Sequence, residues 1–207
     1  AVDALIDRHG YPEAVARVIG EAAALTALLG SALKFEGRFQ LQTRTDGPIE
    51  MIVVDFDTPD RLRAFARFDA ERVAQAVAEG DARSGALIGH GHLAMTIDQG
   101  PTMSRYQGVV AMEGQSLEEA AHQYFRQSEQ IPTRVRLAVA QEFGERGAHW
   151  RAGGLLAQFM PVSPERQRQA DFDPGDAPEG ARAGEEFSED DAWTEAKALV
   201  DTVEDVE

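Results

Sequence analysis

The stretch RYQGVVAMEGQSLEEAAHQYFRQSEQIPTRVR, residues 105–136, predicts a strand, a tight turn, a capped helix and a second strand. The first, β-prone run ends at the turn Glu113-Gly114. Ser116 precedes Glu119 by three residues, the spacing of a capping box that satisfies two free amides at a helix start. Apolar residues then recur at helical spacing and give the helix one apolar face: Leu117, Ala120, Ala121, Tyr124 and Phe125. We expect Pro132 to end the helix, because proline lacks an amide hydrogen and disfavours a helical residue before it.

The remainder of the chain up to Pro161 is rich in strand patterns and contains few helical ones. Residues 12–29 predict a long apolar helix that is buried on more than one side, and residues 70–78 a short one. Turn residues and alternating side chains predict strands at 39–43, 49–53, 61–68, 93–97, 102–111, 135–139 and 155–160. This order lacks a regular βαβ alternation. It favours an α+β fold, in which a mainly antiparallel sheet packs with the long apolar helix and the capped connecting helix.

The composition sets limits on the class of protein. A chain of 207 residues with 43% hydrophobic content is long enough for one main domain with an appendage. The formal net charge of −16 argues against a nucleic acid partner. No uninterrupted apolar run approaches 18 residues and no signal-peptide pattern opens the sequence, so we expect a soluble, cytoplasmic protein without a membrane partner. The chain contains no cysteine and therefore offers no thiolate to zinc.

The character of the sequence changes after residue 162, which divides the chain into a core domain, 1–162, and an acidic linker, 163–207. Residues 165–207 contain 15 acidic and 4 basic side chains, with several prolines and glycines before Ser188. Ser188 is a candidate N-cap of an amphipathic helix spanning 188–206. Its apolar stripe comprises Trp193, Ala196, Val200 and Val203, with Leu199 and Val206 close to it. The stripe indicates either a helix closed permanently over the core or a lid of low stability that uncovers apolar surface.

Residues that could perform chemistry are few. His90 and His92 alternate on a strand without a third ligand nearby, so we interpret them as polar strand-edge residues and expect no metal. His122 is placed on the outer side of the central helix and receives no role. The sequence contains no nucleophile motif and no phosphate loop, so we expect no catalytic residue, no cofactor and no enzyme activity.

Charged residues flank the central helix at 116–128, and two interpretations of them stay open. They would either line a polar cleft for a small ligand or form ion pairs that hold the helix to the sheet. These residues are Arg105, Glu113, Glu129 and Arg134.

Five segments of the chain resemble the heat-shock protein 33 family of bacterial redox-regulated chaperones, which hold unfolding proteins without ATP. They are RYQGVVAMEG (105–114), YFRQSEQIPTRVRLAV (124–139), AGGLLAQFMP (152–161), TALLGSALKFEGRFQLQTRTDGPI (26–49) and GHGHLAMTI (89–97). The most specific part is an ordered motif, hereafter the core motif, made of Tyr106, Gln107, Gly108, Glu113, Gly114, Tyr124, Phe125, Ser128, Glu129, Gln130, Pro132, Thr133 and Arg134.

The resemblance implies that the linker detaches on activation and that unfolded client proteins bind the apolar surface this exposes. The candidate client-binding residues are Phe172, Phe187, Trp193, Leu199, Val200 and Val203. The resemblance also implies that the active form is a homodimer. In the full-length protein it implies a C-terminal domain with four cysteines that bind zinc and respond to oxidation. The zinc domain and a strand preceding Ala1 have no counterpart in this sequence. We therefore expect the chain to be a piece of a longer protein, with an open sheet edge where that strand is missing.

Three classes of function stay open from the sequence. The first is an ATP-independent holdase that needs no oxidant in this piece. The second is an enzyme or small-ligand protein that uses a polar cleft around the helix at 116–128. The third is a dimerisation module whose apolar stripe binds only a second copy. Protection of an unfolding client from aggregation separates the first class from the other two.

Overall fold

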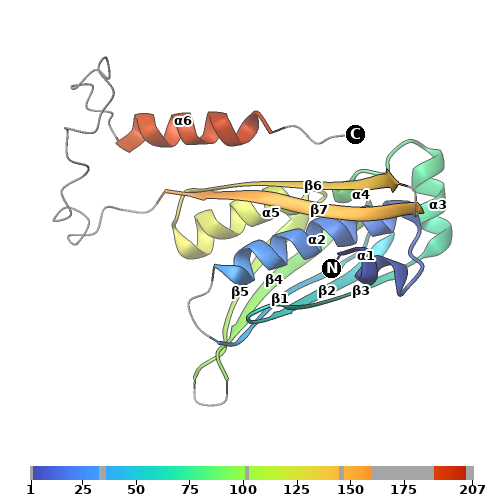
Figure 1. The fold of residues 1–207 in the computed structure, drawn as a ribbon, viewed down its shortest axis with the longest axis horizontal. Helices are drawn as coiled ribbons and strands as arrows, with labels where there is room; N and C mark the ends of the chain where they lie inside the picture. The colour runs from blue at the N-terminus through green and yellow to red at the C-terminus, as the bar shows by residue number, and fades with distance from the viewer. Residues whose placement is uncertain (1, 33–35, 101–102, 145–146, 160–188, 204–207) are drawn as a thin grey trace.

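The structure is a computed structural model that describes residues 2–32, 36–100, 103–144, 147–159 and 189–203 (Figure 1). A five-stranded antiparallel sheet has the strand order β3-β2-β1-β4-β5, and a separate two-stranded ribbon pairs β6 with β7. The strands are β1 Arg38–Thr45, β2 Ile49–Asp57, β3 Arg61–Phe68, β4 His90–Asp98, β5 Tyr106–Glu113, β6 Thr133–Gly144 and β7 Gly147–Gln158. The helices are α1 Val2–Asp7, α2 Glu13–Ser31, α3 Ala70–Ala78, α4 Ser84–Ile88, α5 Leu117–Tyr124 with a π-helical turn η1 Phe125–Glu129, and α6 Glu189–Asp201. The predicted α+β class with a mainly antiparallel sheet is confirmed.

Helix α2 lies between the sheet and the ribbon and contacts both layers (Figure 1). Thirteen of its nineteen residues are buried, as predicted from its many apolar positions. By length and composition alone α2 would be able to cross a membrane. Its burial by strands on two sides accounts for that composition.

Side-chain alternation places one face of each sheet strand in the core. In β1 and β2 the inward residues Phe39, Leu41, Ile52 and Val54 are buried and their neighbours are not. Burying an aliphatic or aromatic side chain of this size contributes about 1.5–3 kcal/mol, so these strands contribute much of the drive for folding. The hairpin around Asp46-Gly47-Pro48 and the third strand are confirmed.

Several predicted boundaries are wrong, and most of the predicted strands are longer than expected, among them β2 and β6. The strand expected from Thr102 begins at Tyr106. The last core strand, expected at 155–160, begins at Gly147, because β7 pairs with β6 along its whole length and glycines at 153 and 154 interrupt the apolar alternation. The final helix ends at Asp201 instead of residue 206. The proposed N-cap Ser188 and the boundary at 162/163 lie outside the described residues.

Helix α5 begins as predicted. Ser116 Oγ accepts a hydrogen bond from the Glu119 amide (3.2 Å), and the Glu119 carboxylate accepts one from the Ser116 amide (2.9 Å). The regular helix stops at Tyr124 and widens into the π-helical turn, which ends at Gln130 in the left-handed conformation (φ 54°). The chain thus leaves the helix before Pro132, and β6 begins at Thr133.

Side chains from two helices accept hydrogen bonds from amides along the two outer edges of the ribbon. On β7, Asp3 Oδ1 accepts the Trp150 amide (2.7 Å), and this bond together with one to His149 lowers the pKa of Asp3. On β6, His122 Nε2 accepts the Val135 amide (2.8 Å), and Glu118 accepts the Leu137 amide. The expectation that His122 faces outward without a role is therefore wrong, because the ribbon packs beside α5 on the side that the helical periodicity left polar.

Gly108 makes close approach possible between β5 and α5. A Cβ atom at this position would lie 2.3 Å from Tyr124 Cε2. Tyr124 is buried and its hydroxyl donates to Glu129, so the ring cannot move aside cheaply.

We expect Gly108→Ala to lower the free energy of unfolding by about 1–3 kcal/mol through overpacking, measured by urea denaturation. Gly153→Ala on β7, where a Cβ meets open space, is the matched control. Equal stability of the two variants would contradict this packing.

Candidate functional site

The core motif fastens α5 and η1 to the edge of the sheet. Glu129 Oε1 accepts hydrogen bonds from the hydroxyls of Tyr124 (2.9 Å) and Tyr106 (3.1 Å), which come from α5 and β5. Burial, followed by the hydrogen bond to Glu129, raises the pKa of Tyr124 far above its usual value. Tyr124 therefore stays a neutral donor at all physiological pH values. One carboxylate thus joins three elements.

Other residues of the core motif also make structural contacts. Gln107 donates to Thr96 across the β4–β5 pair (2.8 Å), and the Gly114 amide donates to the Gly89 carbonyl (3.2 Å). Pro132 accepts the Phe159 amide through its carbonyl (2.9 Å), and Thr133 donates to Ile131 (3.0 Å). Of the remaining members, Phe125 is buried, whereas Glu113, Ser128 and Gln130 are exposed. Most motif residues hold the fold together, and four at the end of the motif also line a space of about 640 Å³ next to α6: Gln130, Pro132, Thr133 and Arg134.

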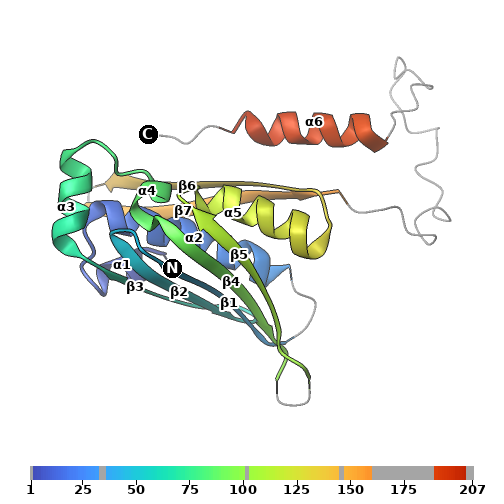
Figure 2. The same ribbon diagram turned by 180° about the vertical axis from the view of Figure 1, so that it is seen from behind.

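The C-terminal end of α6 docks on the outer face of the ribbon through two arginines of β6. Arg134 Nε lies 2.6 Å from Asp201 Oδ1, and Arg136 Nη2 donates to the Val203 carbonyl (3.1 Å). A helix C-terminus carries a partial negative charge, so both guanidinium groups are placed favourably. Figures 1 and 2 show α6 alongside the ribbon from opposite sides. These contacts are partly exposed and therefore individually weak.

The apolar stripe of α6 is divided between a docked side and an exposed side. Trp193, Ala196 and Val200 are half-buried, and the Trp193 ring lies 6.0 Å from the Phe159 ring, centroid to centroid. Leu199 and Val203 are 63% and 42% exposed. Two further candidate residues, Phe172 and Phe187, lie outside the described part of the chain. The helix therefore presents apolar side chains to solvent even while it is docked.

The ribbon surface beneath and beside α6 contains small and apolar residues that were not among the predicted site residues. The strand register places Leu155 opposite Arg136 and Gly153 opposite Ala138 on this outer face. Leu155 is 44% exposed, and a shallow space of about 340 Å³ separates Val203 from this part of the ribbon. Phe143, at the far end of β6, is 79% exposed. For Leu155 the available signal in the sequence was an apolar residue at an outward position of its strand. Phe143 instead shares the alternation of the buried Val135 and Leu137.

The outer face of the five-stranded sheet also carries an apolar row. The register aligns Val109, Ala94, Gln42, Val53 and Phe65 across all five strands. Val109 and Phe65, at the two ends of the row, are the most exposed of its apolar members. Exposed apolar groups on separate faces fit a protein that contacts other macromolecules better than one that encloses a small molecule.

The residues expected to form a polar cleft do not converge. Arg105 pairs with Asp98 (2.8 Å), Arg134 with Asp201, and Glu129 with the two tyrosines. A polar cleft of about 460 Å³ does lie beside the helix, between α4, α5 and β6, but of the four expected residues its lining includes Arg134 alone. Arg136 and Glu118 in this lining pair with each other (3.4 Å). Arg105 and Arg134 do form ion pairs, but with Asp98 of β4 and Asp201 of α6, so these pairs do not hold helix α5 to the sheet as the second interpretation expected.

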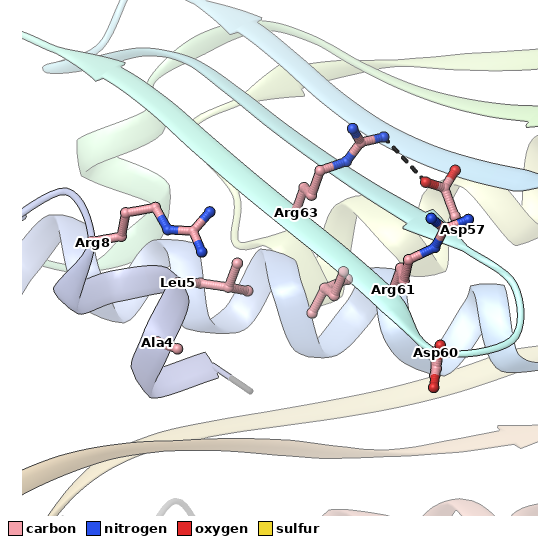
Figure 3. Close-up of a pocket in the computed structure, with 8 residues that line it drawn as sticks. Ala4, Leu5, Arg8, Asp57, Asp60, Arg61 and Arg63 are labelled. Carbon is pink, nitrogen blue, oxygen red and sulfur yellow. Dashed lines mark hydrogen bonds and ion pairs between the residues drawn. The ribbon is translucent and has the colours of Figure 1, made fainter.

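A further open pocket of about 450 Å³ lies between α1 and β3 (Figure 3). Its lining includes Arg8, Arg61 and Arg63 and the carboxylates of Asp57 and Asp60. Asp57 pairs with Arg63 (3.1 Å) and with Arg38 (2.6 Å), and the hydrogen bond from Arg38 is the main cause of its lowered pKa. Asp57 is therefore already paired within the fold and does not act as a free acid or base.

The described residues contain no group of three or more side chains able to hold a metal ion. His90 and His92 lie on β4, and both are exposed. With no cysteine in the sequence, the residues present do not fit the thiolate-bound zinc that the resemblance implies.

We expect Arg134→Gln to weaken the docking of α6. The variant removes an ion pair worth up to about 1 kcal/mol, so amide exchange in 189–201 should accelerate by about two- to fivefold. Exchange measured by mass spectrometry checks this, with 38–57 as an internal reference. Arg151→Gln is the matched control, because Arg151 lies on the same ribbon but pairs with Glu142 (2.7 Å). Equal acceleration in both variants would show that α6 is held by other contacts.

Comparison with known proteins gives concordant results. The family model described as Hsp33 protein matches residues 1–204. The chain is 50% identical to the 33 kDa chaperonin of Caulobacter vibrioides (strain NA1000 / CB15N) over 98% of its length and 61% of that relative. It is 38% identical to the 33 kDa chaperonin of Shewanella loihica over 80% of its length and 52% of that relative. The chain thus spans between half and two thirds of these relatives.

The crystal structure of the 33 kDa chaperonin (heat shock protein 33 homologue) from Thermotoga maritima has a similar fold. The TM-score is 0.60 with 21% sequence identity, over 75% of this chain and 52% of that one. The match of the family model over almost the entire sequence, together with the 50% identical relative, shows that this chain belongs to the Hsp33 family.

Proposed function

We propose that this chain is the client-binding part of an ATP-independent holdase chaperone. The relatives carry the name 33 kDa chaperonin, which supports a chaperone role. The observation that carries the proposal is the weakly held helix α6, which docks on the ribbon beside exposed Leu155 and itself exposes Leu199. An unfolding protein presents apolar segments, and such segments gain free energy from covering surfaces of this kind.

In this proposal, α6 and the client compete for the ribbon. Docked α6 covers the part of the outer face that includes Arg134 and Arg136. Detachment frees this surface and the docked side of the helix, chiefly Trp193 and Val200. A client segment then binds both without ATP, and no chemical step is required.

Redox control is assigned to the longer protein and not to the residues of this chain. The absence of cysteine means that no thiolate switch can form within it. We propose that oxidation elsewhere in the full-length protein acts by loosening α6. We further propose that the active form is a homodimer and that it acts in the cytoplasm. Sedimentation in the presence and absence of client tests the dimer.

We expect the chain to suppress thermal aggregation of a client enzyme in the absence of ATP and oxidant, measured by light scattering. Arg134→Gln should lower the amount of chain needed for half-protection by about two- to fivefold, because α6 detaches more easily. Leu155→Asp should raise it, because a charge replaces exposed apolar surface. Arg151→Gln serves as the control and should match the unaltered chain. Undiminished scattering with a folded chain in excess would overturn the proposed function.

A further inference from the structure

Helix α5 supplies the edge of β6 with two acceptors at the spacing of a neighbouring strand. Glu118 and His122 are four residues apart on the helix and accept the amides of Leu137 and Val135, two residues apart on the strand. Four helical residues span about 6.0 Å and two strand residues about 6.6 Å, so the two periods match. These hydrogen bonds take the place of backbone pairing at this edge.

The bond to Val135 requires a neutral imidazole. An amide can donate only to an unprotonated ring nitrogen, so Nε2 carries the lone pair and the proton of the neutral ring is on Nδ1. Protonation of Nε2 would set two donors against each other at a half-buried position. Glu118 differs in this respect, because a protonated carboxyl group still offers a carbonyl oxygen to Leu137.

The charges around His122 come from every element that packs against it. Glu118 and Glu119 lie on α5, Arg126 on η1, Arg134 and Arg136 on β6, Lys197 and Asp201 on α6, and Arg83 precedes α4. Burial and then the charge of Arg134 lower the pKa of His122, while the negative charges of Asp201 and Glu119 act in the opposite direction. A proton placed here joins a predominantly cationic group.

We propose that His122 is a proton-operated switch at the junction of α5 and β6. Protonation at Nε2 breaks the hydrogen bond to the Val135 amide and loosens the α5–β6 junction. It also loosens α6, because His122, Arg134, Lys197 and Trp193 line one space of about 640 Å³ between these elements. The added charge repels Arg134 and Lys197 and competes with Arg134 for Asp201.

The direction of the pH response follows from the lowered pKa. In the unfolded chain the imidazole binds a proton near pH 6.5, whereas in the folded chain it does so only at lower pH. The stabilising contribution is therefore complete above pH 6.5 and is lost as the pH falls from there through the folded-state pKa. The switch itself is independent of the proposed function, and only its effect on client binding rests on that function.

The test compares amide exchange at pH 7.5 and pH 5.0 by nuclear magnetic resonance, expressed as protection factors, with the His122 ring titrated in the same samples. Between these two values the protection of the Val135 amide should fall by about tenfold, the effect expected from losing one hydrogen bond, and that of α6 should fall with it. The Leu137 amide, bonded to Glu118, should change less.

His122→Gln separates titration from packing. Glutamine places Oε1 as many bonds from Cα as the Nε2 of histidine, so it keeps an acceptor for Val135 but does not titrate. This variant should keep the protection of Val135 equal at both pH values. His92→Gln, at an exposed position on β4, should behave like the unaltered chain.

Two results would overturn the switch: a pH-independent Val135 amide in the unaltered chain, or an equal fall in His122→Gln. A fall at Val135 with α6 unchanged would overturn the coupling to α6. Client protection measured at both pH values is the separate readout for the proposed function. If no variant protects the client from aggregation at either pH, the proposed function is rejected. The amide exchange result would still decide whether the switch exists.

Discussion

The fold depends on the burial of α2 between two layers of strands. A two-stranded ribbon is marginal on its own, because its inner face needs a partner. Helix α2 provides that partner for Val135, Leu137 and Trp150 on one side and for the sheet residues on the other. Without it, neither layer would have a complete core.

Helices also determine which surface of the ribbon is left open. Asp3 of α1 occupies the edge of β7, and Glu118 and His122 of α5 occupy the edge of β6. With α2 beneath, the outer face is the side that remains, and α6 covers part of it. The interactions differ in type. Helix α2 contributes buried apolar contacts, and the two edges add side-chain acceptors for backbone amides, whereas α6 relies on half-exposed groups. This difference explains how one segment can detach while the fold persists.

Sequence patterns identified the elements whose signals are local. The capping box at Ser116, the apolar run of α2 and the alternation in β1 and β2 each depend on neighbours along the chain, and each was predicted correctly. The errors arise where a distant partner decides. Strand β7 is lengthened by pairing with β6, and His122 was misplaced because only the ribbon gives it a donor. In the candidate site, the stripe of α6 was visible as a period, but its division into docked Trp193 and exposed Leu199 depends on how the helix lies on the ribbon.

The position of the polar anchors on α6 has a mechanical consequence. Asp201 and the Val203 carbonyl lie at the C-terminal end of the helix, a few bonds from any polypeptide that continues beyond residue 203. A pull or a rotation applied from that direction would reach Arg134 and Arg136 first, before the contact between Trp193 and Phe159 is loaded. The helix would then peel from its C-terminal end, one contact after another, at a lower force than if all contacts broke together.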